Sequence, residues 1–188
     1  MDYTLIKSKR KTLSLQVTEG GLIVRAPFSV SKRSVERFIK EHELWIDKRR
    51  RELENRREAV RSLPPLTRED IRELADKAKE YIPARAAYYA DVLGVSCGRI
   101  TIRNQKTRWG SCSSKGNLNF NCMLMLTPPE VIDSVVVHEL CHLKHMDHSK
   151  MFYDEVRRAY PEYDRWNGWL KENGRVILMR MENCETAD

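Results

Sequence analysis

The chain has 188 residues, of which 32% are charged and 41% hydrophobic, enough for one well-packed domain or for a small domain beside a larger one. It opens with a polar, basic stretch and contains no long apolar run, so we expect no signal peptide, no membrane association and a cytoplasmic location. Five cysteines without C-x-x-C spacing predict reduced thiols rather than a disulfide framework.

The net charge of +7 is concentrated in the N-terminal third of the chain. Residues 1–62 carry 16 basic and 9 acidic side chains, whereas residues 63–188 carry 18 of each. This asymmetry predicts attraction to an anionic partner such as nucleic acid or a phosphorylated substrate. The alternative interpretation is a basic surface that is only solvated.

The first predicted elements form a small sheet. Apolar and polar residues alternate over residues 12–17, and Gly20-Gly21 separates this run from residues 22–26. Such a pattern predicts a β-hairpin, to which residues 3–7 can add a third strand.

A long helix is expected after the hairpin, because apolar residues recur at helical spacing from residue 32 to about residue 61. The run Lys48–Arg51 places four basic side chains on this helix, which makes it the candidate for weak nucleic-acid association. Pro64 and Pro65 then interrupt the chain. We therefore predict two domains: an N-terminal hairpin and basic-helix unit of residues 1–62, and a catalytic domain of residues 63–188.

The second domain begins with another predicted helix. Thr67 and Asp70 approximate a capping box at its start, Pro83 is expected to kink it, and Gly94 is expected to end it. Residues 99–103 alternate as a strand.

The segment of residues 107–114 contains glycine, serine and cysteine between two predicted strands. It is either a tight turn that anchors Trp109 in the core or a loop that lines a substrate cleft. In the second case Lys106, Arg108 and Trp109 are the candidate substrate-binding residues.

The sequence VVVHELCHLKHMDH, residues 135–148, carries the clearest chemical signal. His138 and His142 form an H-E-x-x-H pattern, and residues four apart on a helix share a face, so both imidazoles can bind one metal ion. Glu139 lies beside them as a candidate general base for a zinc hydrolase. Pro128 and Pro129 suit the first turn of this helix, with Thr127 as its cap.

A catalytic zinc site needs a third protein ligand. His148 is favoured, because a turn after the helix can direct it back toward the metal. His145 stays near the helical register and is expected beside the site, while Glu155 is a further candidate. Cys141 is expected only to pack in the core.

Two more helices are predicted at the C-terminal end. Ser149 should open a short helix that extends to Tyr160, and a second helix should run over residues 161–171 and end at Gly174.

Two blocks in this order, TRWGSCSSKGNLNFN and VVVHELCHLKHMDHSKMF, resemble the YgjP-like family of predicted metal-dependent hydrolases. These are zincin-type proteins whose site is similar to that of SprT-like and WLM metalloproteases. The resemblance covers residues 107–153 and implies His138, His142 and His148 as metal ligands. It also implies Glu139 as the catalytic base.

The chain departs from the family pattern at two places. Cys122 and Met123 stand where the family has Trp-Arg, and Tyr153 stands where tryptophan is frequent. The first departure implies that a basic group near the cleft is missing.

These observations predict an α+β, zincin-like fold with a small sheet flanked by helices. The expected function is zinc-dependent hydrolysis of a peptide or protein, and a nucleotide pyrophosphatase acting on a phosphorylated small molecule is the alternative enzyme. In zincin-type sites an edge strand often pairs with the substrate, and residues 99–103 or 118–125 can serve. A basic nucleic-acid-binding module with structural zinc is the non-enzymatic alternative, but structural sites normally have four ligands and no need of Glu139.

Overall fold

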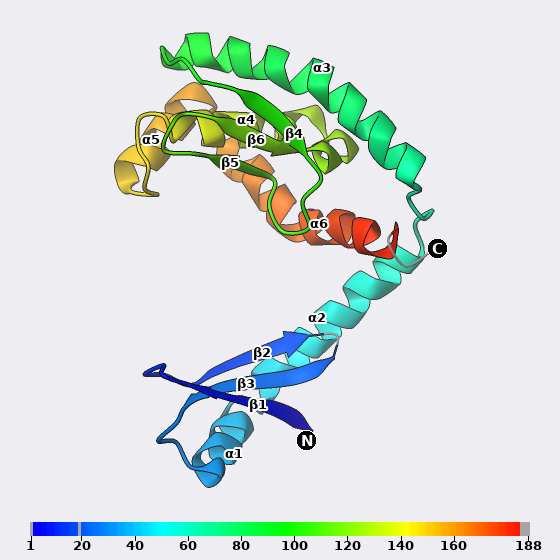
Figure 1. Cartoon of the computed structure of the whole chain (residues 1–188), viewed down its shortest axis with the longest axis vertical. Coiled ribbons are helices and arrows are strands. Elements are labelled where there is room, and N and C mark those ends of the chain that lie inside the picture. Colours follow the sequence, from blue (N-terminus) through cyan, green and yellow to red (C-terminus); the bar gives the residue numbers. More distant parts are fainter. Residues whose placement is uncertain (1, 19, 185–188) are drawn as a thin grey trace. The chain divides into compact units, whose positions relative to one another are not determined.

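The computed structural model describes residues 2–18 and 20–184 of the chain (Figure 1). The chain separates into two compact units, Met1–Ser62 and Leu63–Asp188. Each unit combines helices with one three-stranded sheet, so the predicted α+β class is confirmed as a mixture of helices and small sheets. Across the described residues no helix is both long enough and apolar enough to cross a membrane.

The N-terminal unit is a sheet covered by two helices. Its elements are β1 (Tyr3–Ser8), β2 (Ser14–Thr18), β3 (Gly21–Pro27), α1 (Lys32–Glu41) and α2 (Glu43–Arg61). The central strand β3 pairs antiparallel with β2, as the predicted hairpin requires, and parallel with β1. Alternate residues of β3 are buried and pack with apolar residues of both helices: Leu22, Val24, Ala26, Val35, Ile39 and Ile46.

The prediction of one long helix over residues 32–61 is wrong, because the helix is interrupted at His42. The His42 ring nitrogen Nδ1 lies 2.8 Å from the carbonyl oxygen of Phe38, the group that a continuous helix would bond to the His42 backbone N–H. That N–H instead donates to the carbonyl of Ile39 at 3.1 Å. The side chain of His42 thus competes with the backbone and divides the helix in two.

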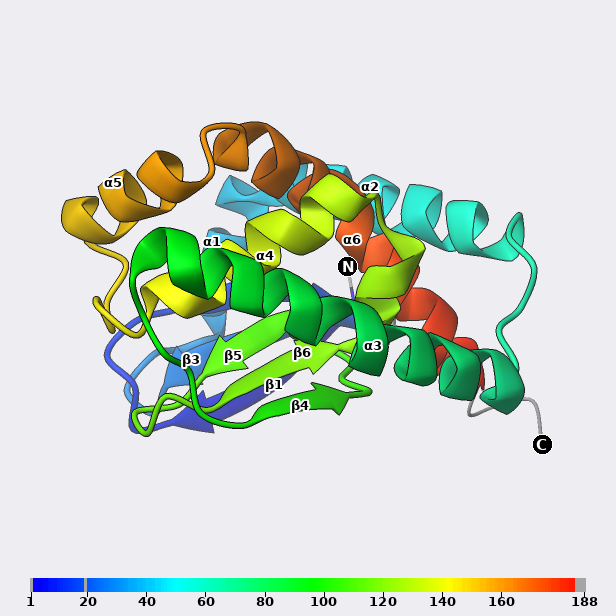
Figure 2. The same ribbon diagram turned by 90° about the horizontal axis from the view of Figure 1, so that it is seen from above.

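The second unit contains the larger core. Its elements are α3 (Arg68–Leu93), β4 (Ile100–Arg103), β5 (Gly110–Cys112), β6 (Leu118–Asn121), a 3₁₀ helix η1 (Cys122–Leu126), α4 (Pro129–Cys141), α5 (Lys150–Ala159) and α6 (Tyr163–Cys184). The strand order is β4-β6-β5, with β4 parallel and β5 antiparallel to the central β6. Helices α3 and α4 lie on the same face of this sheet (Figure 2). Every residue from Val131 to Val137 in α4 is buried, which fits its central position.

Local capping signals fix the ends of α3 as predicted. Thr67 and Asp70 form a reciprocal capping box, in which the Asp70 carboxylate accepts from the Thr67 backbone N–H at 2.7 Å. Gly94 ends the helix in the left-handed conformation at φ 65°, which glycine adopts without steric cost. Pro83 lies inside this helix, which continues on both sides of it.

Three other local predictions differ from the structure. Residues 107–114, expected as a turn or as a loop lining a cleft, include the edge strand β5, and Trp109 lines a cavity. Pro128 rather than Thr127 is the N-cap of α4, since the Thr127 hydroxyl donates back to the Leu124 carbonyl at 2.7 Å. Gly174 lies within α6 and does not end it. A methyl group at Gly174 would come within 3.0 Å of the Trp109 ring, so this glycine makes room for the tryptophan.

Candidate metal centre and adjoining cavity

Three histidines come together at the end of α4. His138 lies in its last turn, His142 is its C-cap, and His148 follows in the connection to α5. One ring nitrogen of each lies within 4.8 Å of the others. The Nε2 atoms of His138 and His148 are only 3.1 Å apart, and the rings of His142 and His148 have centroids 4.7 Å apart. The three side chains therefore form a group that could hold a metal ion.

Two of these imidazoles, those of His138 and His142, are oriented by hydrogen bonds at Nδ1, the ring nitrogen that does not face the cluster. Nδ1 of His142 lies 3.0 Å from the backbone carbonyl of His145. A carbonyl can only accept, so Nδ1 carries the proton and Nε2 keeps its lone pair. Nδ1 of His138 lies 2.9 Å from the Tyr163 hydroxyl, which can accept in the same way. Such partners fix the tautomer and orientation of metal-binding histidines.

The protonation states of the rings also suit a cation. Burial, followed by the charges of His142 and His148, lowers the pKa of His138 to about 4. Burial likewise lowers the pKa of His142. In both rings the lowered pKa favours the neutral imidazole, which is the form that binds Zn²⁺.

Phe152 of α5 packs against the three histidines of the cluster. Its ring is fully buried and contacts all three imidazoles, with centroids 4.9 Å from His138, 4.6 Å from His142 and 5.0 Å from His148. Ser149 caps α5 by accepting from the Phe152 backbone N–H at 3.4 Å. The cap that starts α5 thus places Phe152 beneath the cluster and His148 at its edge.

Glu139 extends from α4 toward strand β5. Its side chain is 6% exposed, and its carboxylate accepts a hydrogen bond from the Cys112 backbone N–H. A methyl group on Gly110 would come within 2.6 Å of a Glu139 carboxylate oxygen, so only glycine permits this contact. Burial raises the pKa of Glu139 to about 7, although the Arg108 charge and the Cys112 N–H act in the opposite direction.

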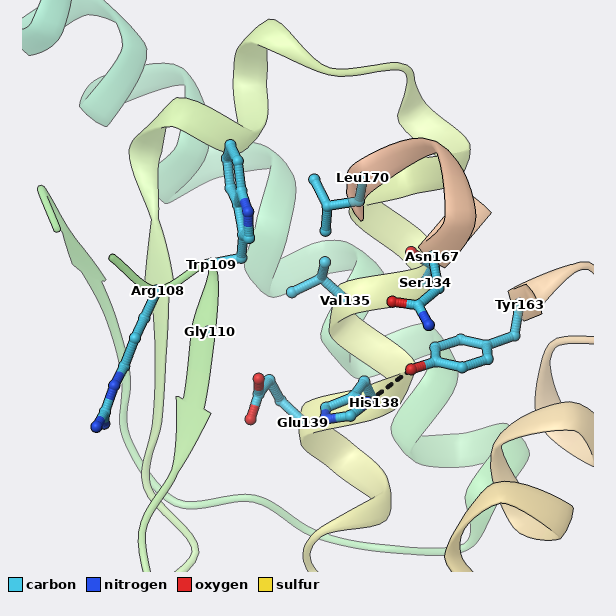
Figure 3. Close-up of a pocket in the computed structure, with 10 residues that line it drawn as sticks. All are labelled: Arg108, Trp109, Gly110, Ser134, Val135, His138, Glu139, Tyr163, Asn167 and Leu170. Carbon is cyan, nitrogen blue, oxygen red and sulfur yellow. Dashed lines mark hydrogen bonds between the residues drawn. The ribbon is translucent and has the colours of Figure 1, made fainter. Parts of the chain in front are cut away.

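A cavity of about 260 Å³ opens beside Glu139 and His138 (Figure 3). It lies between the start of β5, the middle of α4 and the first turns of α6. Its lining residues are Arg108, Trp109, Gly110, Ser134, Val135, His138, Glu139, Tyr163, Asn167 and Leu170. A buried carboxylate and a histidine cluster thus face a space that can admit part of a substrate.

The candidate substrate-binding residues differ in their positions. Trp109 is half-buried and lines the cavity, while Arg108 is exposed and its side chain extends away from the other lining residues (Figure 3). Lys106 is exposed and is not among the lining residues. Cys122 and Met123, which replace the basic position of the family pattern, are fully buried in the core.

The alternative third ligands lie outside the cluster. His145 takes part through its backbone carbonyl, which accepts from His142. The Glu155 carboxylate lies 2.6 Å from Lys144 Nζ and 2.8 Å from an Arg158 guanidinium nitrogen. These two bonds lower the pKa of Glu155 to about 2. Glu155 is therefore engaged in an ion-pair network away from the three ring nitrogens.

The strand beside the site is also different from the two that the sequence suggested. Strand β6 is central and has neighbours on both sides, whereas β5 is an edge strand and contains the residues that contact Glu139. Strand β4 is the other edge of the sheet, so a substrate strand at residues 99–103 stays a prediction, whereas residues 118–121 form the central strand and are paired on both sides.

Sequence reasoning missed several residues that line the cavity, among them Gly110, Tyr163 and Asn167. Tyr163 and Asn167 lie on α6, about 25 residues beyond the H-E-x-x-H segment, and no local spacing connects them to it. Gly110 had a usable signal, because a glycine inside a strand often marks a close approach of another group.

Neutral imidazoles grouped beside a buried carboxylate and a cavity are typical of metal-dependent hydrolases. A comparison with protein families agrees: the YgjP-like family of metallopeptidase domains matches residues 11–72 and 66–173. The chain belongs to this family, and the resemblance read from the sequence is confirmed.

Two solved structures of metallopeptidase zymogens are similar to part of the chain. Abylysin of Pyrococcus abyssi is 23% identical, with a TM-score of 0.45, and the similarity covers 50% of this chain and 96% of abylysin. Jannalysin of Methanocaldococcus jannaschii is 22% identical, with a TM-score of 0.44, covering 50% of this chain and 97% of jannalysin. None of the curated proteins matches the chain significantly.

Proposed function

We propose that the chain is a metal-dependent peptidase in which His138, His142 and His148 hold one Zn²⁺ ion and Glu139 is the general base. The observation that carries this proposal is the position of the Glu139 carboxylate. It is buried, fixed by β5 and placed beside the histidine cluster at the cavity. Membership of a metallopeptidase family supports the same reaction class.

The chain's own residues supply proton transfer and orientation. A divalent cation, when bound, supplies Lewis-acid activation of water and of a substrate carbonyl. The Glu139 carboxylate then accepts the proton of the attacking water and returns it to the leaving amine. In the metal-free site, burial raises the pKa of this carboxylate above that of an exposed glutamate.

Peptide rather than phosphoanhydride hydrolysis is favoured by the charges around the cavity. Binding several phosphate groups normally requires cationic side chains directed at them. Arg108 is the one Lys or Arg among the cavity's described lining residues, and it extends outward (Figure 3). A neutral amide carbonyl needs no such charge.

The test is a paired screen of the zinc-loaded protein against an unfolded protein and against nucleoside triphosphates. We expect peptide cleavage that Glu139→Gln abolishes while its zinc content stays unchanged. Glu130→Gln is the matched control, because Glu130 is exposed in the first turn of the same helix and does not line the cavity. Pyrophosphate release without peptide cleavage would instead establish the phosphoanhydride hydrolase.

A further inference from the structure

The cavity beside Glu139 has two chemically different ends. Glu139 and His138 lie at one end, and Trp109, Val135 and Leu170 lie together at the other (Figure 3). Its volume of about 260 Å³ is below the roughly 300–1,000 Å³ of typical small-molecule sites. A space of this size fits one amino-acid side chain better than a whole nucleotide.

The apolar end is built from three separate elements. Val135 comes from α4, one turn before Glu139, and Leu170 comes from α6; they are only 7% and 9% exposed. Trp109 precedes β5, and its ring packs closely against Gly174 of α6. An apolar side chain that entered here would exchange contacts with water for contacts with carbon atoms, which is favourable in proportion to the apolar surface removed from water.

The other residues that line the apolar end of the cavity carry no charge that could pair with a charged substrate side chain. Asn167 is neutral, and the Ser134 hydroxyl donates to the Val131 carbonyl at 2.8 Å. The Tyr163 hydroxyl is paired with His138. A charged substrate side chain would therefore lose its hydration without gaining an ion pair.

We propose that this cavity receives the side chain of a substrate residue that flanks the scissile bond, and that it selects an apolar side chain such as Leu, Met or Phe. Leu170 limits the size of that side chain and Asn167 its charge. This inference rests on the proposed peptidase function, since Glu139 and His138 mark where the bond would be cleaved. A side chain one residue away from that bond can extend toward Leu170.

The primary experiment is digestion of a mixed-sequence peptide library by the zinc-loaded protein, with the cleavage sites identified by mass spectrometry. We expect one position next to the cleaved bond to be enriched in Leu, Met and Phe by about tenfold over Asp, Glu and Lys. That magnitude is the lower range of discrimination for a pocket that distinguishes side chains by apolar fit.

Two variants test the roles proposed for Leu170 and Asn167. Leu170→Trp should reduce kcat/KM for a peptide with Phe at this position by about tenfold, while a peptide with Ala there changes much less. Asn167→Asp should move the preference toward Lys and Arg. Asn173→Asp is the matched control, because Asn173 lies on the same helix, does not line the cavity and donates to the Trp169 carbonyl at 2.9 Å.

A binding measurement separates recognition from catalysis. Glu139→Gln should bind an intact Phe-containing peptide about tenfold more tightly than its Asp-containing counterpart. Cleavage without any preference beside the bond, or an unchanged preference in a Leu170→Trp variant that melts like wild type, would overturn the inference and leave the peptidase function standing. If zinc-loaded wild type cleaves no peptide, the proposed function fails and the inference fails with it.

Discussion

The two sheets of this chain have the same strand order but different surroundings. In each, the third strand in sequence is central, the first strand pairs parallel with it and the second pairs antiparallel. The core against the N-terminal sheet is built from apolar side chains. The second sheet instead places its edge strand β5 against the carboxylate of Glu139.

This difference shows that strand topology alone does not create a site. All the buried polar or charged residues of the described chain lie in the second unit: Asn121, Thr127, Asp133, Ser134, Glu139 and His142. A buried polar group needs a specific partner, and the second unit supplies those partners from distant segments. The Asp133 carboxylate, for example, accepts from the Arg85 guanidinium at 2.7 Å and from the Tyr89 hydroxyl at 3.1 Å.

The largest effect is expected when a ring nitrogen of the cluster is removed. His148→Ala should lower zinc affinity by more than about a hundredfold, which exceeds the usual effect of losing a partner that only orients a ligand. His145→Ala should change it little, because the His145 carbonyl that orients His142 belongs to the backbone and survives the substitution. Zinc content after dialysis against a weak chelator measures both. Retention by His148→Ala together with loss from His145→Ala would reverse the assignment.

The contact between β5 and α4 is tested by Gly110→Ala. The added methyl group would come within 2.6 Å of the Glu139 carboxylate and must displace it. We expect kcat for peptide cleavage to fall about a hundredfold with zinc retained, since a misplacement of about 1 Å can have this effect. Gly168→Ala is the control, because a methyl group there meets no atom within 4 Å. Equal activity in both variants would show that β5 does not position Glu139.

Tyr163 should contribute a smaller, indirect effect on metal binding. Removing its hydroxyl in Tyr163→Phe takes away the partner of His138 Nδ1, which typically weakens metal affinity about ten- to a hundredfold. Tyr160→Phe is the matched control, because that hydroxyl donates to the Glu130 carbonyl at 3.1 Å, away from the cluster. Competition titration with a chromophoric chelator measures both affinities. Equal zinc affinities in Tyr163→Phe and Tyr160→Phe would show that the Tyr163 hydroxyl does not contribute to metal binding.

The sequence predicted those features that depend on neighbouring residues. Thr67 with Asp70, Ser149 and Gly94 mark helix ends correctly, because capping is local. The i, i+4 spacing of His138 and His142 likewise follows from helix geometry, and the structure brings them together.

Some errors arose from local side-chain hydrogen bonds, as at His42 and Thr127, and others arose where distant segments decide the local structure. Gly174 looked like a helix end, yet its missing side chain accommodates Trp109 from another part of the chain. The strand identity of Gly110–Cys112 depends on pairing with β6, and the hydroxyl of Tyr163 meets His138 only after α6 has packed on α4. Contacts of this kind leave no periodic pattern in one sequence.

The smallest effect on hydrolysis is expected from the N-terminal unit, whose basic run Lys48–Arg51 lies exposed on α2. Changing all four residues to Gln should leave cleavage of a short neutral peptide within about twofold, since a neutral peptide has no charge for exposed basic side chains to attract. The same change should weaken any association with DNA or RNA and reduce its dependence on salt concentration, because each phosphate contact contributes to that slope.

The matched control for this last prediction neutralises Arg68, Arg72, Lys77 and Lys79, four exposed residues of α3 in the other unit. Both variants lose the same net charge, so a difference between them reports position rather than total charge. Fluorescence anisotropy with a labelled oligonucleotide, measured over a range of salt concentrations, gives both affinity and slope. Equal weakening of oligonucleotide binding in the two variants would mean that only net charge matters. Undetectable binding by wild type at low salt would show that the basic run on α2 is merely solvated. Selective weakening in the α2 variant, with peptide cleavage unchanged, would separate an anion-binding unit from a peptidase unit in one chain.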